Sequence, residues 1–148
     1  MSIPPPALAV SIALSTLATS RILEPIWLPN GIASCCALLL AALGTALDVS
    51  AKGLFVRQGT TVNPMTPGST TVIVRAGAYR WSRNPMYLGR VMQLFALAIY
   101  LGNLPGLLGA LLFAIYLDRV QIPAEEQALT ERFSGDYLNY RSGVRRWL

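Results

Sequence analysis

Residues 86–120 read MYLGRVMQLFALAIYLGNLPGLLGALLFAIYLDRV and consist of two apolar segments on either side of a short turn. The turn, GNLPG at 102–106, carries no charge and is rich in Gly and Pro, which is typical of a tight reversal. We therefore predict an antiparallel hairpin of two helices, over residues 86–101 and 104–120. Both are short for membrane spans, since a span needs roughly 20 residues and at least about 17.

The composition indicates that lipid, rather than water, surrounds much of the chain. Only 13% of its 148 residues are charged, against about 25% in soluble domains, and its mean hydropathy is +0.48. Two more apolar stretches, about 7–23 and 31–55, precede the hairpin. We predict a single all-α, polytopic membrane domain over residues 1–148, with about four transmembrane helices and a C-terminal amphipathic helix.

The basic residues are distributed asymmetrically. Of twelve Lys and Arg residues, only Arg21 lies outside the region 52–90 and the tail from residue 119 onward. The positive-inside rule then places the loop over 57–85 and the tail over 121–148 in the cytoplasm. We predict a multi-pass protein of the inner or cytoplasmic membrane with both termini in the cytoplasm. The net charge of +5 fits contact with anionic headgroups, and nucleic acid is not expected as a partner.

Small residues line one helical face of the stretch over 31–55, a pattern that allows close helix packing in lipid. They are Ala33, Ala37, Ala41, Gly44 and Thr45. Asp48 continues this face, and a carboxylate at membrane depth is costly without a partner. Asp48 is interpreted either as a ligand or charge relay in a site, or as a helix-end residue paired with Lys52.

The chain offers no ligand set for a metal ion. It contains no His, and its two cysteines, Cys35 and Cys36, are adjacent. Neighbours on a helix point about 100° apart, so a disulfide between them is geometrically poor. We predict no metal site and interpret both thiols as small buried apolar side chains.

The loop over 57–76 contains several Gly and Pro residues, followed by a β-branched run over 70–74. This pattern predicts an extended, hairpin-like surface segment. It is interpreted either as a cap over a site or as a plain connector.

A first polar cluster, GAYRWSRNPMYLG at 77–89, leads into the hairpin. Pro85 restricts Asn84 to an extended conformation and suits the first turn of a helix. Free N–H groups at that helix start favour an anion, and Arg83 would add a bidentate clamp for a carboxylate. The alternative is anchoring of arginine and aromatic side chains at the membrane surface.

A second polar cluster, Glu125-Glu126, follows the hairpin and begins a predicted amphipathic helix. The apolar stripe of this helix comprises Leu129, Phe133 and Tyr137, with Tyr140 beside them. Glu125 shares the stripe and should point to the buried side, with Glu126 about 100° around the helix. Vicinal carboxylates can accept hydrogen bonds from ribose hydroxyls or an ammonium group. The alternative is ordinary pairing of acids with a helix N-terminus. At the end of the chain, Arg145-Arg146-Trp147 is interpreted first as a headgroup anchor.

In order and separation, these segments resemble those of a known superfamily. The segments are Gly77-x-Tyr79-Arg80-x-Ser82-Arg83-Asn84-Pro85-Met86-Tyr87-Leu88-Gly89, the hairpin, Glu125-Glu126-x-x-Leu129, Phe133, Tyr137, Tyr140 and Val144-Arg145-Arg146-Trp147. Over roughly the C-terminal half, the chain resembles the isoprenylcysteine carboxyl methyltransferase and phospholipid methyltransferase superfamily. The resemblance implies an integral-membrane methyltransferase that uses S-adenosylmethionine in a cytoplasmic pocket and takes a lipid-like acceptor from the bilayer.

The resemblance also implies a set of cofactor-binding residues. They are Arg83, Asn84, Pro85, Tyr87, Glu125, Glu126, Leu129, Tyr137 and Arg141. Arg83 and Glu126 are assigned the catalytic role. The two glutamates would hold polar groups of the cofactor, and Arg83 would pair with its carboxylate. The chain departs from the superfamily at Asn84, where His is usual, which excludes a titrating imidazole. It also has Ser134 where Gly is usual, a difference expected to be minor.

Two other functions remain open. A sterol-reductase-like enzyme would use NADPH, although such reductases are larger, and a non-catalytic membrane scaffold would bind lipid without chemistry. For a methyltransferase, the acceptor would be an isoprenylcysteine-type carboxylate, a lipid amine or a small isoprenoid acid. The oligomeric state is left open.

Overall fold

The structure, a computed structural model, describes residues 3–27, 30–59 and 72–148, and in these ranges it contains helices and connecting segments but no strand. The elements in chain order are α1 (Pro5–Thr19), α2 (Gly31–Arg57), the 3-10 helix η2 (Gly77–Arg80), α3 (Pro85–Tyr100), α4 (Leu104–Tyr116), the π-helical η3 (Leu117–Gln121) and α5 (Ile122–Gly143). The all-helical prediction is confirmed for these residues. Of the run over 70–74 predicted to be extended, residues 72–74 have no regular structure and the other two lie outside the described residues.

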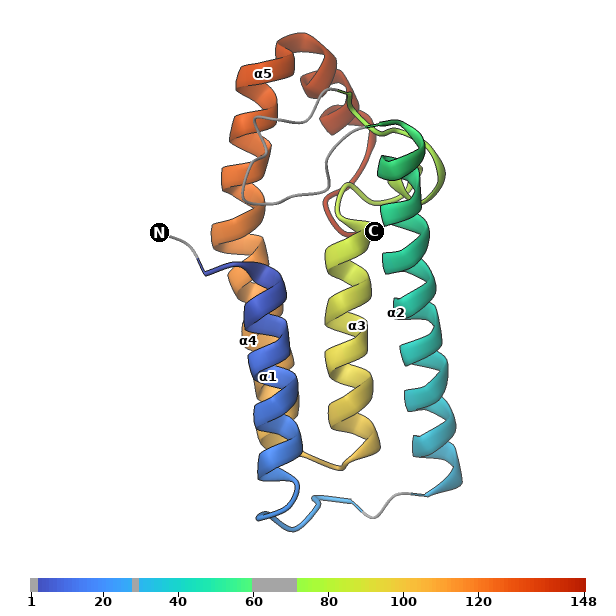
Figure 1. Cartoon of the computed structure of the whole chain (residues 1–148), viewed down its shortest axis with the longest axis vertical. Helices are drawn as coiled ribbons and strands as arrows, with labels where there is room; N and C mark the ends of the chain where they lie inside the picture. Colours follow the sequence, from blue (N-terminus) through green and yellow to red (C-terminus); the bar gives the residue numbers. More distant parts are fainter. Residues whose placement is uncertain (1–2, 28–29, 60–71) are drawn as a thin grey trace.

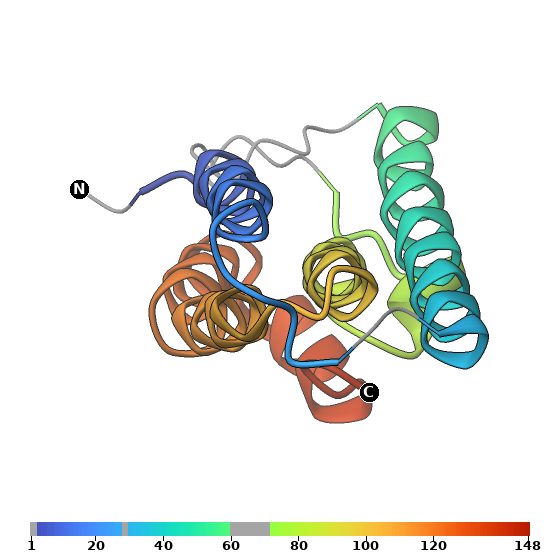
Figure 2. The ribbon, with the colours of Figure 1, turned by 90° about the horizontal axis from the view of Figure 1, so that it is seen from below.

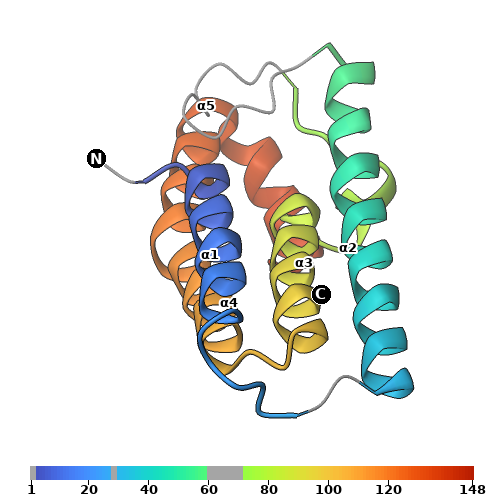
Figure 3. The ribbon, with the colours of Figure 1, turned by 60° about the horizontal axis from the view of Figure 1, so that its bottom comes forward.

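The helices α1 to α4 lie side by side along the long axis of the molecule (Figure 1). α3 packs against α2 on one side and against α1 and α4 on the other, as the end-on and tilted views also show (Figures 2 and 3). Because the chain reverses direction between successive helices, the start of α3, the end of α2 and the end of α4 lie at one end of the bundle (Figure 1). Both polar clusters are therefore brought to that end.

The predicted hairpin is present. α3 ends at Tyr100 and α4 begins at Leu104. The reversal requires the positive φ of +59° at Gly102, a conformation that glycine adopts without strain. Asn103 then caps α4, because its side-chain oxygen accepts a hydrogen bond from the N–H of Gly106 over 2.7 Å.

α2 and α3 approach most closely at Gly44 and Gly89. A Cβ atom on Gly89 would lie only 2.4 Å from the carbonyl oxygen of Gly44, so both positions need glycine for the backbones to meet. Asp48 is buried beside this contact, and its Oδ2 lies 2.6 Å from Nζ of Lys52. Arg90 reaches its other oxygen at 3.9 Å. The structure thus supports the helix-end pairing of Asp48 with Lys52.

Two helices are long and apolar enough to cross a bilayer, namely α2 and the continuous helix from Leu104 to Gly143. α1 and α3 are shorter, with 15 and 16 residues. At about 1.5 Å per residue, a helix of that length covers roughly 24 Å of a hydrocarbon core of about 30 Å.

Residue 120, where the sequence predicts the end of the fourth span, lies inside a helix. The structure has no break between the fourth apolar segment and the tail, because α4, η3 and α5 form one continuous helix. Pro123 lies inside it and cannot donate a backbone hydrogen bond, and its ring crowds the carbonyl of Arg119 four residues earlier. The wider π turn over Leu117–Gln121 accommodates this crowding.

The outer surface of the bundle is apolar. The exposed large side chains include Leu38, Leu39, Leu43, Leu108, Leu111 and Leu112. Cys35 and Cys36 are also exposed, so the prediction that they are buried is wrong. The physical reason is that α2 packs against α3 along one face only, which leaves its other faces outward. Such a surface fits a lipid environment.

α5 bends at Ser134, which has the positive φ of 43°. Beyond the bend, the helix turns back toward the start of α3, and the C-terminus lies close to that point (Figure 1). The substitution of Ser for the usual Gly is therefore not minor, since it places a side chain in a conformation that favours glycine.

Candidate active site

The start of α3 is held by the last residues of the chain. Pro85 occupies the first turn of α3, and Asn84 makes no side-chain capping bond there. Instead, the amide of Asn84 donates to the carbonyl of Arg146 over 3.1 Å. The backbone N–H of Arg83 donates to the carbonyl of Arg145 over 2.9 Å. Asn84 therefore acts as a hydrogen-bond donor, a task that does not require a titrating ring.

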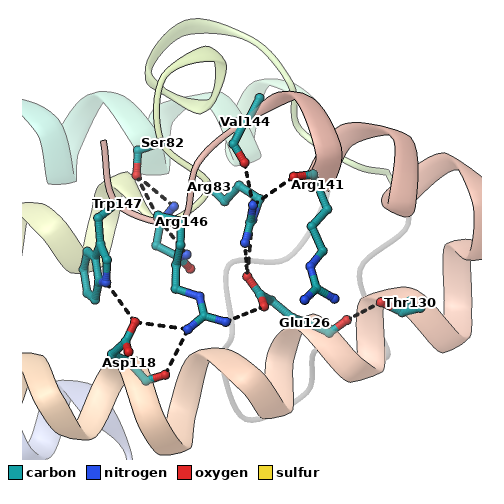
Figure 4. Close-up of polar contacts among 10 residues, drawn as sticks. Ser82, Arg83, Asp118, Glu126, Thr130, Arg141, Val144, Arg146 and Trp147 are labelled. Atoms are coloured by element: carbon teal, nitrogen blue, oxygen red, sulfur yellow. Dashed lines mark hydrogen bonds and ion pairs between the residues drawn. The ribbon is translucent and has the colours of Figure 1, made fainter.

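Arg83 and Glu126 face each other across this end of the bundle (Figure 4). NH2 and Nε of Arg83 donate to Oε1 of Glu126 over 2.7 and 3.2 Å. NH1 of Arg83 donates to the carbonyls of Arg141 and Val144. The side chains are only 10% and 7% exposed. The predicted meeting of the two polar clusters is confirmed, and all three nitrogens of the guanidinium are engaged.

Glu126 also forms an ion pair with a second arginine. Its Oε2 accepts a hydrogen bond from NH2 of Arg146 over 2.9 Å. Burial would raise the pKa of Glu126, but the hydrogen bonds and charges of Arg146 and Arg83 outweigh burial and hold the pKa below its ordinary value. Glu126 is therefore a stable carboxylate between two guanidinium groups.

Glu125 lies in a different environment. Its Oε1 accepts hydrogen bonds from the hydroxyl of Tyr87 and from Nε2 of Gln121 over 2.7 Å. Burial raises the pKa of Glu125, the two donors lower it in part, and the charge of Glu126 raises it further. Glu125 points toward α3, as the stripe on α5 predicts.

The remaining predicted residues on α5 lie near this pair. Tyr137 is buried, and its ring lies 6.2 Å from that of Tyr140. Burial raises the pKa of Tyr137 to about 12, so it stays protonated. The hydroxyl of Tyr140 donates to the carbonyl of Tyr79 over 2.7 Å, which ties the returning part of α5 to η2. Leu129 is half-buried.

A hollow of about 330 Å³ opens beside Glu126. Its lining includes Glu126, Thr130, Arg141 and Arg146. Figure 4 shows the guanidinium of Arg141, which lies beyond the bend of α5, directed toward the first part of the same helix, between Glu126 and Thr130. Of the predicted cofactor-binding residues, Glu126 and Arg141 thus line this hollow. The others do not, namely Arg83, Asn84, Pro85, Tyr87, Glu125, Leu129 and Tyr137. The physical reason is that Arg83 and Tyr87 turn inward to satisfy the two glutamates.

Sequence reasoning missed four residues of this network, which are Gln121, Asp118, Arg146 and Trp147. Arg146 and Trp147 were expected to face lipid headgroups, yet both donate to Oδ1 of Asp118, over 3.1 and 3.0 Å. The motif at 144–147 in the resemblance was the signal that could have placed them here. Among the described residues, no group of three or more Cys, Asp or Glu side chains could hold a metal ion.

The sequence profile described as "Phospholipid methyltransferase" matches residues 32–136, which is most of the chain and includes both polar clusters. The chain belongs to the phospholipid methyltransferase family. Membership in this family identifies a membrane methyltransferase and is consistent with the apolar helices.

Two relatives have sequences similar to this family member. An uncharacterized protein of Haemophilus influenzae is 38% identical over 63 residues, which cover 43% of this chain and 100% of that protein. The protein-S-isoprenylcysteine O-methyltransferase of Saccharomyces cerevisiae is 35% identical over 79 residues, or 51% of this chain. The chain covers only 32% of the length of the yeast enzyme. No solved structure matches significantly.

Proposed function

We propose that this protein transfers a methyl group from S-adenosylmethionine to a lipid-like acceptor embedded in the membrane, either an isoprenylcysteine-type carboxylate or a lipid amine. The observation that carries the proposal is the contact of Arg83 with Glu126, which joins the two clusters of the family at one end of an apolar bundle. The similarity to the yeast enzyme, whose name states an isoprenylcysteine acceptor, supports the choice of acceptor class.

The proposed arrangement in the membrane has four spans, with the site at the cytoplasmic surface. Two of these spans would be α2 and the helix that begins at Leu104, and α1 and α3 would be the other two. Lys52, Arg57 and Arg83 lie at the end of the bundle that carries the site, where the positive-inside rule places the cytoplasm.

The hollow beside Glu126 fits the polar end of S-adenosylmethionine. Its volume of about 330 Å³ falls in the range of about 300–1,000 Å³ that ligand pockets occupy. The Glu126 carboxylate could accept hydrogen bonds from ribose hydroxyls or from the ammonium group, and the Arg141 guanidinium could pair with the carboxylate of the cofactor. Thr130 adds a hydroxyl to the lining.

Arg83 has a supporting role in this arrangement. It already donates to Glu126 and to two backbone carbonyls, so the expected contact with the cofactor carboxylate would require one of these bonds to open. Arg141 is better placed for that contact because it lines the hollow. Arg83 then contributes to catalysis by fixing Glu126.

When bound, S-adenosylmethionine supplies an electrophilic methyl group whose bond to sulfur breaks as the new bond to the acceptor forms. The chain has to align this group with the acceptor and exclude water. A carboxylate acceptor needs no base, whereas an ammonium acceptor must first lose a proton. Asn84 cannot take that proton, so a lipid amine would have to lose it to solvent.

The proposal is tested by titrating the purified protein in detergent with S-adenosylmethionine and, separately, with NADPH. We expect binding of the first and not of the second. Incubation with isotopically labelled S-adenosylmethionine and a lipid extract, followed by mass spectrometry, should then show a labelled lipid. Binding of NADPH alone would support a reductase, and binding of neither would refute methyl transfer.

A further inference from the structure

The last residues of the chain connect three segments that carry the site. The carbonyl of Arg145 accepts the backbone N–H of Arg83, and the carbonyl of Val144 accepts its guanidinium. The carbonyl of Arg146 accepts the amide of Asn84 and the hydroxyl of Ser82. The carbonyls of residues 144–146 are therefore all hydrogen-bonded to residues 82–84, directly before α3. The segment 144–147 lies outside the range that matches the family profile, which ends at residue 136.

The side chain of Arg146 bridges two carboxylates on the continuous helix (Figure 4). NH2 donates to Glu126 over 2.9 Å, and NH1 donates to Oδ1 and to the carbonyl of Asp118, over 3.1 and 3.2 Å. Trp147 donates to the same Oδ1 over 3.0 Å. Asp118 belongs to η3, where the wider π turn interrupts the α-helical register between α4 and α5.

These contacts form a chain of alternating charges from Asp118 through Arg146 and Glu126 to Arg83. Each oxygen of the Glu126 carboxylate is met by a different guanidinium, so the carboxylate cannot rotate without breaking one ion pair. Arginine suits this position because two different nitrogens of its planar fork, NH1 and NH2, meet the two carboxylates, whereas lysine offers a single nitrogen.

The neighbouring Arg145 behaves differently. It is exposed, and the side-chain contact that its guanidinium makes within the described residues is a 3.5 Å bond to the carbonyl of Leu148. Arg145 therefore fits the headgroup-anchoring interpretation, whereas Arg146 does not. The two arginines provide a matched pair with the same chemistry and different surroundings.

We propose that Arg146, held in place by Asp118 and Trp147, is a positioning residue that fixes the Glu126 carboxylate for binding of the methyl donor. This inference rests on the proposed function, because it takes S-adenosylmethionine as the ligand of the hollow. Arg146 acts through Glu126 and itself belongs to the lining of the hollow. Arg146 and Trp147 are thus part of the site rather than a membrane anchor.

The test compares the variants Arg146→Gln, Arg146→Lys and Arg145→Gln with the unaltered protein. Calorimetric titration with S-adenosylmethionine gives the dissociation constant, and hydrogen exchange of the ligand-free protein reports on the amide of Arg83. Arg146→Gln should weaken binding by about tenfold or more, since it removes a hydrogen bond between charged groups. Arg146→Lys should lie between, because lysine restores one ion pair. Arg145→Gln should bind within about twofold of the unaltered protein.

A further variant separates positioning from general stability. Trp147→Phe removes the Nε1 donor to Asp118 together with part of a ring that packs against the core. It should weaken binding less than Arg146→Gln, with faster exchange of the Arg83 amide in both. If Arg146→Gln does not fold, Arg146→Lys and Trp147→Phe decide the question. The positioning role is overturned if Arg146→Lys and Arg145→Gln both bind as tightly as the unaltered protein. The proposed function would survive that result. Absence of binding by the unaltered protein would instead overturn the proposed function, and this inference with it.

Discussion

The substitution Glu126→Gln removes the charge at the centre of the network. Gln keeps one oxygen that can accept from Arg83, but its amide NH₂ group then faces NH2 of Arg146, which is also a donor. Two guanidinium groups are left with one neutral acceptor between them. The side chain of Arg83 is 10% exposed and that of Arg146 28% exposed, so water can compensate only the second in part.

The expected cost follows from these contacts. Removing one partner from a fully buried ion pair costs about 3–5 kcal/mol. Because Arg146 retains partial solvation and a second partner in Asp118, and because the Gln oxygen keeps one bond to Arg83, we expect the free energy of unfolding to fall by about 2–3 kcal/mol. The contrasting variant is Glu131→Gln, which alters an exposed carboxylate that contacts Gln127. It should change the free energy of unfolding by less than about 0.5 kcal/mol.

The assay is equilibrium unfolding in detergent micelles, measured at several pH values. The folded-state pKa of Glu126 is lowered, so its contribution is fully present above pH 4.5, the ordinary value for Glu, and is lost as the pH falls through the folded-state pKa. The difference between the unaltered protein and Glu126→Gln should therefore be largest near neutral pH and shrink in acid. Glu125, whose pKa is raised, makes a contribution to stability that falls as the pH rises. It is present in both proteins, so this contribution largely cancels in the difference between them.

A difference that stays constant down to pH 3 would refute the reasoning, because it would mean that the charge of Glu126 contributes nothing. A difference below about 0.5 kcal/mol at neutral pH would contradict the burial argument as well.

Three other substitutions test packing and hydrogen bonding, each by the free energy of unfolding. Gly89→Ala should destabilise by about 3 kcal/mol or more, because the new Cβ would lie 2.4 Å from the backbone oxygen of Gly44 and the two helices would have to separate. Ser134→Gly should stabilise by about 1 kcal/mol, since it relieves a φ of 43°. Tyr87→Phe should destabilise by about 1–2 kcal/mol, because Glu125 loses one of its two donors.

Controls for these substitutions are available in the same helices. Gly53→Ala on α2 meets nothing within 4 Å and should be neutral or slightly stabilising. If it destabilises as much as Gly89→Ala, the close approach of α2 and α3 is not the cause. Gly135→Ala also meets nothing within 4 Å and should not reproduce the gain expected from Ser134→Gly.

Composition and local pattern alone determined the helical class and the hairpin of this protein, and the order of its motifs carried the resemblance to its family. A low charge content and long apolar runs are properties of the whole chain, and the turn at 102–106 is specified by residues that adjoin one another. The small-residue face and the pairing of Asp48 with Lys52 could also be predicted from the sequence, since a helix brings residues four apart together. The two polar clusters were found for the same reason, because each occupies a short stretch of sequence.

The tertiary structure decided how these parts connect. The fourth helix continues past Pro123 because the π turn over Leu117–Gln121 accommodates the proline. No local sequence pattern predicted this turn. Arg83 meets Glu126 rather than open solvent, and Arg146 and Trp147 turn inward to Asp118 rather than outward to lipid. An arginine near a membrane surface can pair with a headgroup or with a carboxylate of its own chain. The choice depends on which carboxylate the fold brings within about 3 Å, and that distance is set by packing between residues far apart in the sequence.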